Sequence, residues 1–291
     1  MDKAPRVGAH RMIDLHSHTT ESDGTYTPAE LIDTALEIGL DALAITDHDT
    51  LAGYRIAAPL AQATGLRLIC GIELSTKIYE PSRKTVHLLG YFCSDPPTAA
   101  FEEWLGAMQA ARRDRNIRLA AKLRSMGVDV TIEEVEALGR SLAGRPHFAR
   151  LMVQKGYVPN STEAFRLYLD ESAPGYVDRE EPTLAEGIRR IKDAGGVTSL
   201  AHPIRLGKRD LAEEEDLIAG FVRDGLDAIE AYHSDHEVAD VQRYLSYAGK
   251  HGMRVTGGSD FHGANKPSVQ LGQANVPTSL LDQLLHQRQR S

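Results

Sequence analysis

Cysteine is scarce in this chain, and long apolar runs are missing from it. The 291 residues include only Cys70 and Cys93, which excludes a disulfide framework and favours a reducing cytoplasm. No stretch approaches the roughly 18 uninterrupted apolar residues of a membrane-spanning helix. Residues 1–11 also lack the apolar segment of a secretory signal. We therefore expect a cytoplasmic protein without a membrane partner.

A surplus of positive charge is missing as well. The chain has 33 Lys and Arg against 41 Asp and Glu, so its formal net charge is −8. This balance argues against stable binding of duplex nucleic acid, which needs a broad basic face. It leaves room for a small phosphorylated ligand at a local positive site.

Strand-like and helix-like segments alternate along most of the chain, which favours parallel β/α architecture. The first predicted helix has Thr27 as its N-cap, Pro28 at its first position and Gly39 at its end. The predicted strands cover residues 12–15, 42–46, 67–74, 85–92, 197–202, 227–232 and 253–259.

The alternation stops between residues 101 and 178. This stretch has no good strand and predicts successive helices at 101–126, 131–138, about 145–155 and about 161–169. We therefore predict an α/β domain formed by residues 1–100 and 179–291, with an all-helical insertion of residues 101–178.

Side chains that bind metals follow the predicted strands. His16 and His18 lie two positions apart where the first strand ends, so both point to the same side. The carboxyl ends of parallel strands meet at one rim, where ligands gather. Six of the seven predicted strands bring His, Asp or Glu to this rim. The candidate ligands are His16, His18, Asp23, His48, Glu73, His87, His202, Asp260 and His262.

The chemistry of this set indicates both the metal and the reaction. Nine ligands are too many for one ion, and imidazole with carboxylate suits Mn, Fe or Zn. Paired ions about 3.5–4 Å apart clamp the oxygens of an in-line phosphoryl displacement and generate hydroxide at neutral pH. The sequence therefore predicts two or three divalent ions, with manganese first among the candidates. The predicted nucleophile is a metal-bridging hydroxide.

The remaining histidines have less context. His87 lies inside a strand, where simple packing is an alternative to ligation. His233 follows a strand. One interpretation is a contact that supports a metal ligand, and we favour the other, which gives it no role in the site. His10, His251 and His286 are expected at the surface.

The order and spacing of these motifs resemble the PHP (polymerase and histidinol phosphatase) family. The motifs are H-x-H followed by Asp23, TDHDT at 46–50, G-x-E at 71–73, His87, AHP at 201–203 and SDFH at 259–262. The resemblance implies a distorted (β/α)7 barrel with up to three divalent metals. It assigns one ion to His16, His18, Glu73 and Asp260, a second to Asp23, His48 and His262, and a third to Glu73, His87 and His202.

Two positions near these ligands qualify the resemblance. In several relatives the position of Asp23 is histidine, so the preferred metal could differ here. Asp47 and Asp49 flank His48, and we expect them to orient imidazole rings.

Arginines mark the predicted insertion. Arg112, Arg115 and Asn116 are spaced i, i+3 and i+4 on one helical face, where arginine forks could grip a terminal phosphate. A solvated helix surface is the alternative. Arg145 and His147 lie at the start of another helix, in Gly-Arg-Pro-His, which suits either an anion site or an ordinary helix start.

These insertion motifs resemble the PHP branch of small metal-dependent nucleotide phosphoesterases. The resemblance implies hydrolysis of the 3′-phosphate of a 3′,5′-nucleotide bisphosphate, such as 3′-phosphoadenosine 5′-phosphate to AMP and phosphate. The arginines would hold the remaining phosphate, and Asp260 or His262 would move the proton. The nearest alternative is a 5′-3′ exoribonuclease on short 5′-phosphorylated RNA. A histidinol phosphatase and a non-catalytic metal-stabilised module are weaker alternatives.

Overall fold

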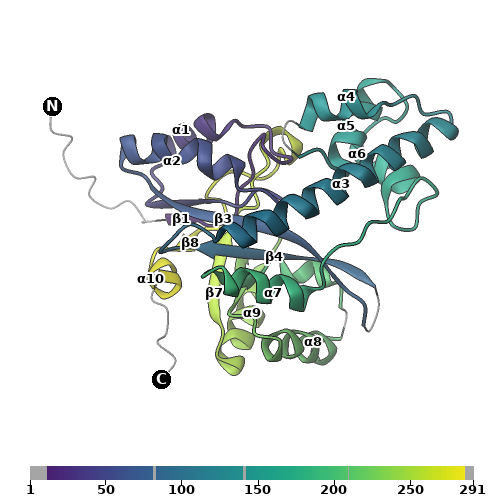
Figure 1. The fold of residues 1–291 in the computed structure, drawn as a ribbon. Helices are drawn as coiled ribbons and strands as arrows, with labels where there is room; N and C mark the ends of the chain where they lie inside the picture. The colour runs from purple at the N-terminus through teal and green to yellow at the C-terminus, as the bar shows by residue number, and fades with distance from the viewer. Residues whose placement is uncertain (1–11, 81–82, 140–141, 209, 286–291) are drawn as a thin grey trace.

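The structure, a computed structural model, describes residues 12–80, 83–139, 142–208 and 210–285 (Figure 1). The segment 1–11, which includes His10, and the C-terminal His286 lie outside the described residues. The predictions for them stay predictions. In the described ranges, no helix combines the length and the apolar character needed to cross a membrane.

One sheet lies at the centre of the molecule, in the order β7-β6-β5-β4-β3-β2-β1-β8 (Figure 1). Its strands are β1 (Met12–Asp14), β2 (Ala42–Ile45), β3 (Arg67–Ile78), β4 (Lys84–Phe92), β5 (Val197–Leu200), β6 (Ala228–His233), β7 (Arg254–Gly258) and β8 (Val276–Pro277).

The sheet curls until β1 meets β7. The backbone N–H of Leu15 donates to Gly257 O at 3.1 Å, and that of Asp260 donates to His16 O at 2.9 Å. Gly258 permits this approach, because a Cβ at that position would lie 2.3 Å from the His16 nitrogen. The result is a nearly closed barrel of β1 to β7, with β8 antiparallel beside β1. The predicted distorted α/β barrel is confirmed.

One barrel strand runs against the others. β4 is antiparallel to both β3 and β5, whereas the other barrel pairs are parallel. The expectation of parallel strands was wrong here, because only residues 79–83 separate β3 from β4, too few for the crossover that a parallel pair needs. In this arrangement His87, near the start of β4, pairs with Ser75 near the end of β3. His87 therefore reaches the same rim as the strand ends.

Helices flank the barrel, and a further group of helices extends beyond it (Figure 1). The flanking helices are α1 (Pro28–Ile38), α2 (Ala52–Thr64), α7 (Leu184–Asp193), α8 (Leu211–Arg223), α9 (Val238–His251) and α10 (Ser279–Leu285). The group between β4 and β5 consists of α3 (Ala99–Ser125), α4 (Ile132–Gly139), α5 (Arg145–Gln154), α6 (Ser161–Ala164) and a π-helical turn over Phe165–Leu169. Short 3-10 turns cover Pro203–Leu206 and Gly263–Asn265.

The local signals for α1 act as predicted. The side chain of Thr27 accepts from Glu30 N, and the Glu30 carboxylate accepts from Thr27 N, which completes a capping box. Gly39 ends the helix with φ of 79°, a conformation that glycine adopts without strain. Buried Leu31 and Ala35 then face the barrel side of the molecule.

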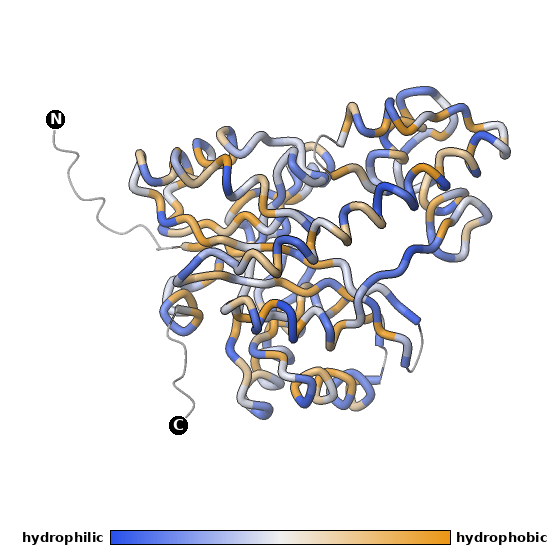
Figure 2. Tube along the Cα trace, viewed as in Figure 1, coloured by the Kyte–Doolittle hydropathy of each residue, from blue (hydrophilic) through white to orange (hydrophobic). Residues whose placement is uncertain are grey.

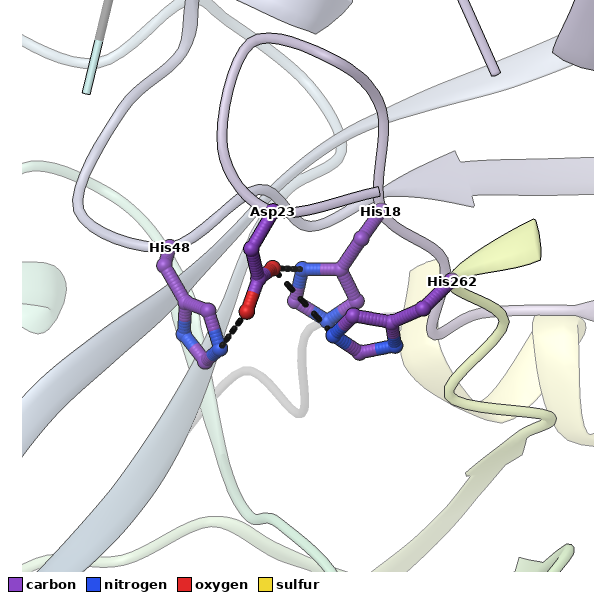
Figure 3. A group of neighbouring side chains, drawn as sticks. All are labelled: His18, Asp23, His48 and His262. Carbon is purple, nitrogen blue, oxygen red and sulfur yellow. Dashed lines mark ion pairs between the residues drawn. The ribbon is translucent and has the colours of Figure 1, made fainter. Parts of the chain in front are cut away.

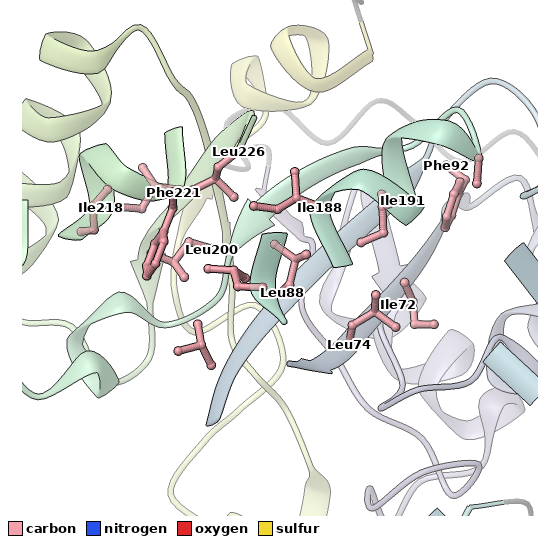
Figure 4. Packing of buried hydrophobic residues seen from close by; sticks show 14 of the residues in the cluster. Ile72, Leu74, Leu88, Phe92, Ile188, Ile191, Leu200, Ile218, Phe221 and Leu226 are labelled. Carbon is pink, nitrogen blue, oxygen red and sulfur yellow. The ribbon is translucent and has the colours of Figure 1, made fainter. Parts of the chain in front are cut away.

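The main apolar core lies between the sheet and its flanking helices. Figure 4 shows Ile72 and Leu88 of the β3–β4 hairpin beside Ile188 and Ile191 of α7. The strands form a mostly apolar band through the centre of the molecule, while the outer faces of the helices are largely polar (Figure 2). This rigid layer fixes the strand ends that carry the site.

The helices between β4 and β5 have an apolar cluster of their own. Leu119 and Leu123 of α3 pack there with Phe148 and Met152 of α5. The first turns of α3 belong instead to the barrel, where Phe101 is part of the main core. The predicted insertion boundary at residue 101 thus falls inside a helix that runs from the barrel into the helical group (Figure 1).

Candidate metal centre

The predicted ligands of the first ion lie together at the rim of the barrel. Ligand atoms of His16, His18, Glu73 and Asp260 are all within 4.8 Å of one another. Glu73 Oε2 lies 3.3 Å from His16 Nε2 and 3.1 Å from His18 Nε2. Asp260 Oδ1 lies 3.5 Å and 3.4 Å from the same two nitrogens.

Asp23 lies among three histidines (Figure 3). Its Oδ1 is 3.2 Å from His262 Nε2 and 3.6 Å from His18 Nδ1, and its Oδ2 is 3.8 Å from His48 Nε2. This group therefore contains the predicted ligands of the second ion, with His18 beside them.

The other oxygen of Glu73 faces two further histidines. Glu73 Oε1 lies 2.9 Å from His87 Nδ1 and 3.0 Å from His202 Nε2. His48 also comes close enough to form a ligand group with Glu73 and His87. All nine predicted ligands are thus brought to one rim.

Unsatisfied polar atoms mark the middle of this cluster. His16 Nε2, His18 Nε2, His48 Nδ1 and Glu73 Oε2 are buried and have no hydrogen-bond partner in the described structure. Buried polar atoms are normally satisfied, so this concentration requires an explanation. Each of these atoms offers a lone pair, and imidazole with carboxylate is a donor set for divalent metals. The residues present therefore fit divalent ions.

The protonation states of these groups determine which of them can bind a metal directly. Burial would raise the pKa of Glu73, but the imidazoles of His48 and His87 hold it well below its ordinary value. Burial lowers the pKa of His48 and of His202 to about 3, so both rings are neutral at physiological pH.

Burial also lowers the pKa of His18, but the neighbouring carboxylates of Asp260 and Glu73 outweigh it and raise the value to about 9. Burial lowers the pKa of His16 as well, but the carboxylates of Glu230, Glu73 and Asp260 outweigh it and hold the value well above its ordinary 6.5. A metal must therefore displace a proton from both His16 and His18 in order to bind them.

Glu230 supports two of the ligands and was missed by the sequence analysis. Its buried Oε1 accepts from His16 Nδ1 at 2.9 Å, and its Oε2 accepts from His202 N at 2.7 Å. A proton fixed on Nδ1 leaves the Nε2 lone pair of His16 free for an ion. The available signal was a carboxylate inside the apolar strand β6.

Three residues of the site have backbone conformations that are uncommon outside glycine. The φ angles are 52° for Asp49, 29° for His202 and 56° for Asp260. Such conformations cost about 1–3 kcal/mol each and persist where the surroundings hold them in place. The Glu230 contact holds the backbone of His202, and the Asp260 N–H is bound to His16 O.

Cationic side chains surround the outer oxygen of Asp260. Its Oδ2 lies 3.0 Å from Arg205 Nη2 and 2.5 Å from Lys266 Nζ. His233 is buried with its Nε2 3.5 Å from the same oxygen. Of the two interpretations of His233, the structure therefore favours a contact that supports a candidate ligand over the absence of a role, because the end of β6 places it beside Asp260. His251, in contrast, lies away from the rim and contacts Glu215.

The two carboxylates beside His48 act differently from expectation. Asp47 accepts from the Ser22 hydroxyl at 2.5 Å, and that hydroxyl lies 3.4 Å from His18 Nδ1, so Asp47 supports a ring only through Ser22. For Asp49 the prediction was wrong: its carboxylate pairs with Arg112 of the helical group. The left-handed backbone of Asp49 turns this side chain away from the neighbouring imidazole.

A pocket adjoins the metal-binding groups. Three predicted ligands contribute to its wall, namely Asp23, His48 and His87. The opposite wall contains four arginines and a histidine from the helical group and the segment that follows it. These are Arg112, Arg115, Arg145, His147 and Arg179.

Most of the predicted substrate-binding residues thus lie in this pocket, but Asn116 does not. Its side-chain amide donates to Ala143 O at 2.9 Å and so supports the loop before α5. Arg179 was missed by the sequence analysis, because it lies in an irregular segment without a motif. His147 accepts from Gly144 N at 3.0 Å through Nδ1, which fixes the start of α5.

The four arginines fall into two pairs. Arg112 and Arg179 both contact the Asp49 carboxylate, and Arg179 also lies 2.8 Å from Glu181. Arg115 and Arg145 have no carboxylate at ion-pair distance among the residues described. Arg115 is only 5% exposed, and its Nε has no hydrogen-bond partner.

Burial lowers the pKa of Arg115 to about 9, and the neighbouring cations act in the same direction. The side chain is therefore still charged at neutral pH. A buried charge without a partner is costly, and an anion bound in this pocket would offset that cost.

Comparisons with known proteins agree with this geometry. A family model described as the PHP domain matches residues 14–150. The chain is 33% identical to a 3′,5′-nucleoside bisphosphate phosphatase of Chromobacterium violaceum over 264 residues, which covers 89% of this chain and 90% of that protein. The chain belongs to the PHP domain family. A second PHP relative, the 5′-3′ exoribonuclease Rnm of Escherichia coli, is 32% identical over 90% of this chain and 88% of its own length.

Two solved structures are similar to this chain over nearly its full length. A Bifidobacterium adolescentis protein, provisionally assigned as a metal-dependent phosphoesterase, superposes with a TM-score of 0.83 at 32% identity, over 95% of this chain and 96% of that one. A C. violaceum protein described as an amidohydrolase, solved with sulfate and without metal, gives 0.80 at 31% identity over 94% and 96%. The prediction of a metal-dependent phosphoesterase of the PHP family is confirmed.

Proposed function

We propose that this protein removes the 3′-phosphate from small nucleotides that also carry a 5′-phosphate, the 3′,5′-nucleotide bisphosphates. One observation carries the proposal: a single pocket is lined both by candidate metal ligands and by arginines that lack carboxylate partners. The relative from C. violaceum, named for this activity, supports it. The small number of cysteines supports a cytoplasmic location.

The nine rim residues would hold two or three divalent ions, and we propose manganese. Ions bound there supply a water of lowered pKa and neutralise charge on the phosphoryl oxygens. The side chains keep the geometry fixed, since Glu73 contacts histidines of all three groups and Glu230 holds the ring of His16.

Asp260 and His262 are the proposed proton-transfer groups. His262 Nδ1 donates to the Asp260 backbone oxygen at 2.8 Å, which leaves its Nε2 facing the pocket residue Asp23. Either group could accept the proton of the attacking water or protonate the leaving 3′-oxygen, and both lie beside the ligand groups.

The proposed insertion, residues 101–178, supplies the phosphate site with help from Arg179. Four arginines against Asp49 and Glu181 leave two positive charges unbalanced. A terminal phosphate is a dianion that arginine forks bind in bidentate fashion. Arg115 and Arg145 are the members free to bind it.

A second pocket favours short 5′-phosphorylated RNA as an alternative substrate. The wall of this pocket includes His87, His202, Arg145 and Arg205. It shares His87 and Arg145 with the first pocket, so the two meet beside the proposed third ion. In a phosphodiester the scissile phosphate carries a further nucleoside, for which this pocket offers space and positive charge. The E. coli relative named as an exoribonuclease supports this alternative.

A comparison of substrates tests the proposal. We would measure kcat/KM of the manganese-loaded protein for 3′-phosphoadenosine 5′-phosphate, a short 5′-phosphorylated RNA and histidinol phosphate. We expect the bisphosphate to be hydrolysed fastest and histidinol phosphate slowest, because the latter lacks a second phosphate for the arginines. Absence of hydrolysis with every phosphoester would contradict the proposal and favour a non-catalytic module.

A further inference from the structure

We propose that Asp49 is a positioning residue that sets where the terminal phosphate binds, an inference that rests on the proposed function. By holding Arg112 and Arg179 as fixed parts of the wall, Asp49 leaves Arg115 and Arg145 as the cations that contact the ligand. The selectivity of the pocket then depends on a carboxylate that does not itself contact the substrate.

The position of Asp49 is fixed from several directions. The residue is fully buried, and its Oδ1 accepts from Ser75 N at 2.7 Å. Its backbone N–H donates to Glu73 O at 3.0 Å, and its backbone oxygen accepts from Gln109 Nε2 at 2.8 Å. The carboxylate thus has no freedom to follow a ligand.

Asp49 joins three separate segments of the chain. It follows β2 in the barrel, Arg112 comes from α3, and Arg179 comes from the segment that leads back to α7. Arg112 is held further by the Ser75 hydroxyl at 3.0 Å, and Arg179 by Glu181 at 2.8 Å. The buried carboxylate of Asp49 lies at hydrogen-bond distance from both guanidinium groups and so holds them in place.

Arg115 and Arg145 have no such restraint. Arg145 donates to Leu169 O at 3.2 Å and stacks on the Tyr176 ring, contacts that orient it without neutralising it. Arg115 has an unsatisfied Nε in the pocket wall. Without the Asp49 charge, Arg112 would join Arg115 and Arg145 as a cation available to the phosphate, whereas Glu181 would still pair with Arg179. Binding would tighten while the nucleotide shifted out of register with the metal ligands.

The test uses Asp49→Asn, which keeps the shape and removes the charge. Calorimetry on the manganese-loaded protein gives dissociation constants for adenosine and adenosine 5′-monophosphate. The dissociation constant of adenosine divided by that of the monophosphate measures the contribution of the phosphate. We expect the variant to increase this ratio about tenfold, the effect of one added charge-assisted hydrogen bond. We expect kcat for the bisphosphate to fall at the same time. In an Arg112→Ala background the effect of Asp49→Asn should be smaller.

Asp47→Asn is the matched control. Asp47 lies on the other side of His48 and is equally buried, but its partners are Thr19 and Ser22, and it contacts neither arginine. Its substitution would disturb the metal-binding loop without changing the charge beside the arginines. We therefore expect the ratio of dissociation constants to stay as in the parent protein.

Several outcomes would overturn the inference. They are an unchanged ratio in Asp49→Asn, an equal weakening of both ligands, or the same shift in Asp47→Asn. If Asp49→Asn did not fold, Arg115→Ala and Arg112→Ala decide the matter: the inference requires the larger loss of phosphate binding in Arg115→Ala. If Asp49→Asn shifted the ratio of dissociation constants but the parent protein did not hydrolyse the bisphosphate, only the proposed function would be refuted. Hydrolysis without any shift would refute the role of Asp49 alone.

Discussion

At the residue scale, Arg115 carries a charge that the described protein does not balance. Its guanidinium is buried in the pocket wall near Arg112 and Arg145, and no carboxylate among the described residues pairs with it. Most buried charges stabilise a fold only when they are paired, so this one lowers stability in the absence of a ligand. The proposed binding of a terminal phosphate would explain why an arginine occupies this position.

Replacing Arg115 with alanine should therefore weaken catalysis and not folding. We expect kcat/KM for the bisphosphate to fall about 10- to 100-fold, since a charge-assisted hydrogen bond contributes roughly 1.5–3 kcal/mol. The kcat/KM for a nucleoside 3′-monophosphate, which has no 5′-phosphate for the arginines to bind, should fall much less. Thermal unfolding should show a melting temperature equal to or above that of the parent protein.

Arg113→Ala provides the control, because Arg113 is the exposed neighbour on the same helix and pairs with Glu136. Its kcat/KM values should match the parent for both substrates. An equal loss for both substrates in Arg115→Ala would contradict a phosphate-binding role.

Whether the sequence revealed a site residue depended on whether a local pattern marks its position. The ligands at strand ends were predictable, because β-strand alternation and parallel topology bring such residues to one rim. Glu230 and Arg179 were not, since each acts through a partner far away in sequence: Glu230 through His16 and Arg179 through Asp49. No local pattern reports such a pairing.

At the scale of elements, the helical group between β4 and β5 depends on its own small core. Phe148 of α5 is fully buried there. We expect Phe148→Ala to lower the free energy of unfolding by about 3–5 kcal/mol, measured by urea denaturation. The metal content should be unchanged, because the nine ligands lie outside this group.

Leu167→Ala serves as the comparison, since Leu167 lies in the same helical group but is 38% exposed. Its effect should be below about 1 kcal/mol. Loss of metal in parallel with stability in Phe148→Ala would show that the group does not unfold separately from the barrel.

The segment that leads from the helical group back to the barrel is held by buried charges. Lys77 lies 3.3 Å and Arg179 lies 2.8 Å from Glu181. Burial would raise the pKa of Glu181, but Arg179 and Lys77 lower it below the ordinary value of 4.5. A carboxylate with a lowered pKa in the folded state adds stability above its unfolded pKa and loses it as the pH falls through the folded pKa.

Glu181→Gln should therefore be less stable than the parent protein at pH 7, and the difference should shrink as the pH falls below 4.5. Urea denaturation of the metal-free protein at a series of pH values measures this difference. Glu136→Gln is the control, because its partner Arg113 is exposed and such pairs contribute little. A difference between Glu181→Gln and the parent that stays constant down to about pH 3 would contradict the assignment.

The elements themselves were mostly predictable, and the exceptions have physical causes. Helix signals such as Thr27 and Gly39 are local, so the bounds of α1 were found from sequence. The direction of β4 depends on its pairing with β3, which the alternation of residues does not report. The insertion boundary was displaced because α3 is one continuous helix whose two halves pack in different cores.

At the scale of the whole molecule, metal binding should contribute to stability. Ligands that bind only the folded state stabilise it by about 4 kcal/mol at 1,000 times their dissociation constant. Removing the metal with a chelator should therefore lower the melting temperature by about 5–10 °C. Differential scanning calorimetry with and without the chelator measures this shift.

Glu73→Gln should abolish most of this shift, since Glu73 contacts histidines of all three groups. Its metal content, determined by elemental analysis, should fall in step. A full chelator-induced shift in Glu73→Gln would show that the stabilising ions bind elsewhere.

The closure of the barrel also orders the events of folding. The N–H of Asp260 is bound to the backbone oxygen of His16, so the seam of the barrel and the proposed first metal site share these two residues. These two ligands are separated by most of the chain, and their contact forms only after β7 has docked. A newly made chain that ended before β7 would display several histidines yet hold no tight ion. High-affinity metal binding would thus indicate that β1 and β7 have come together and closed the barrel.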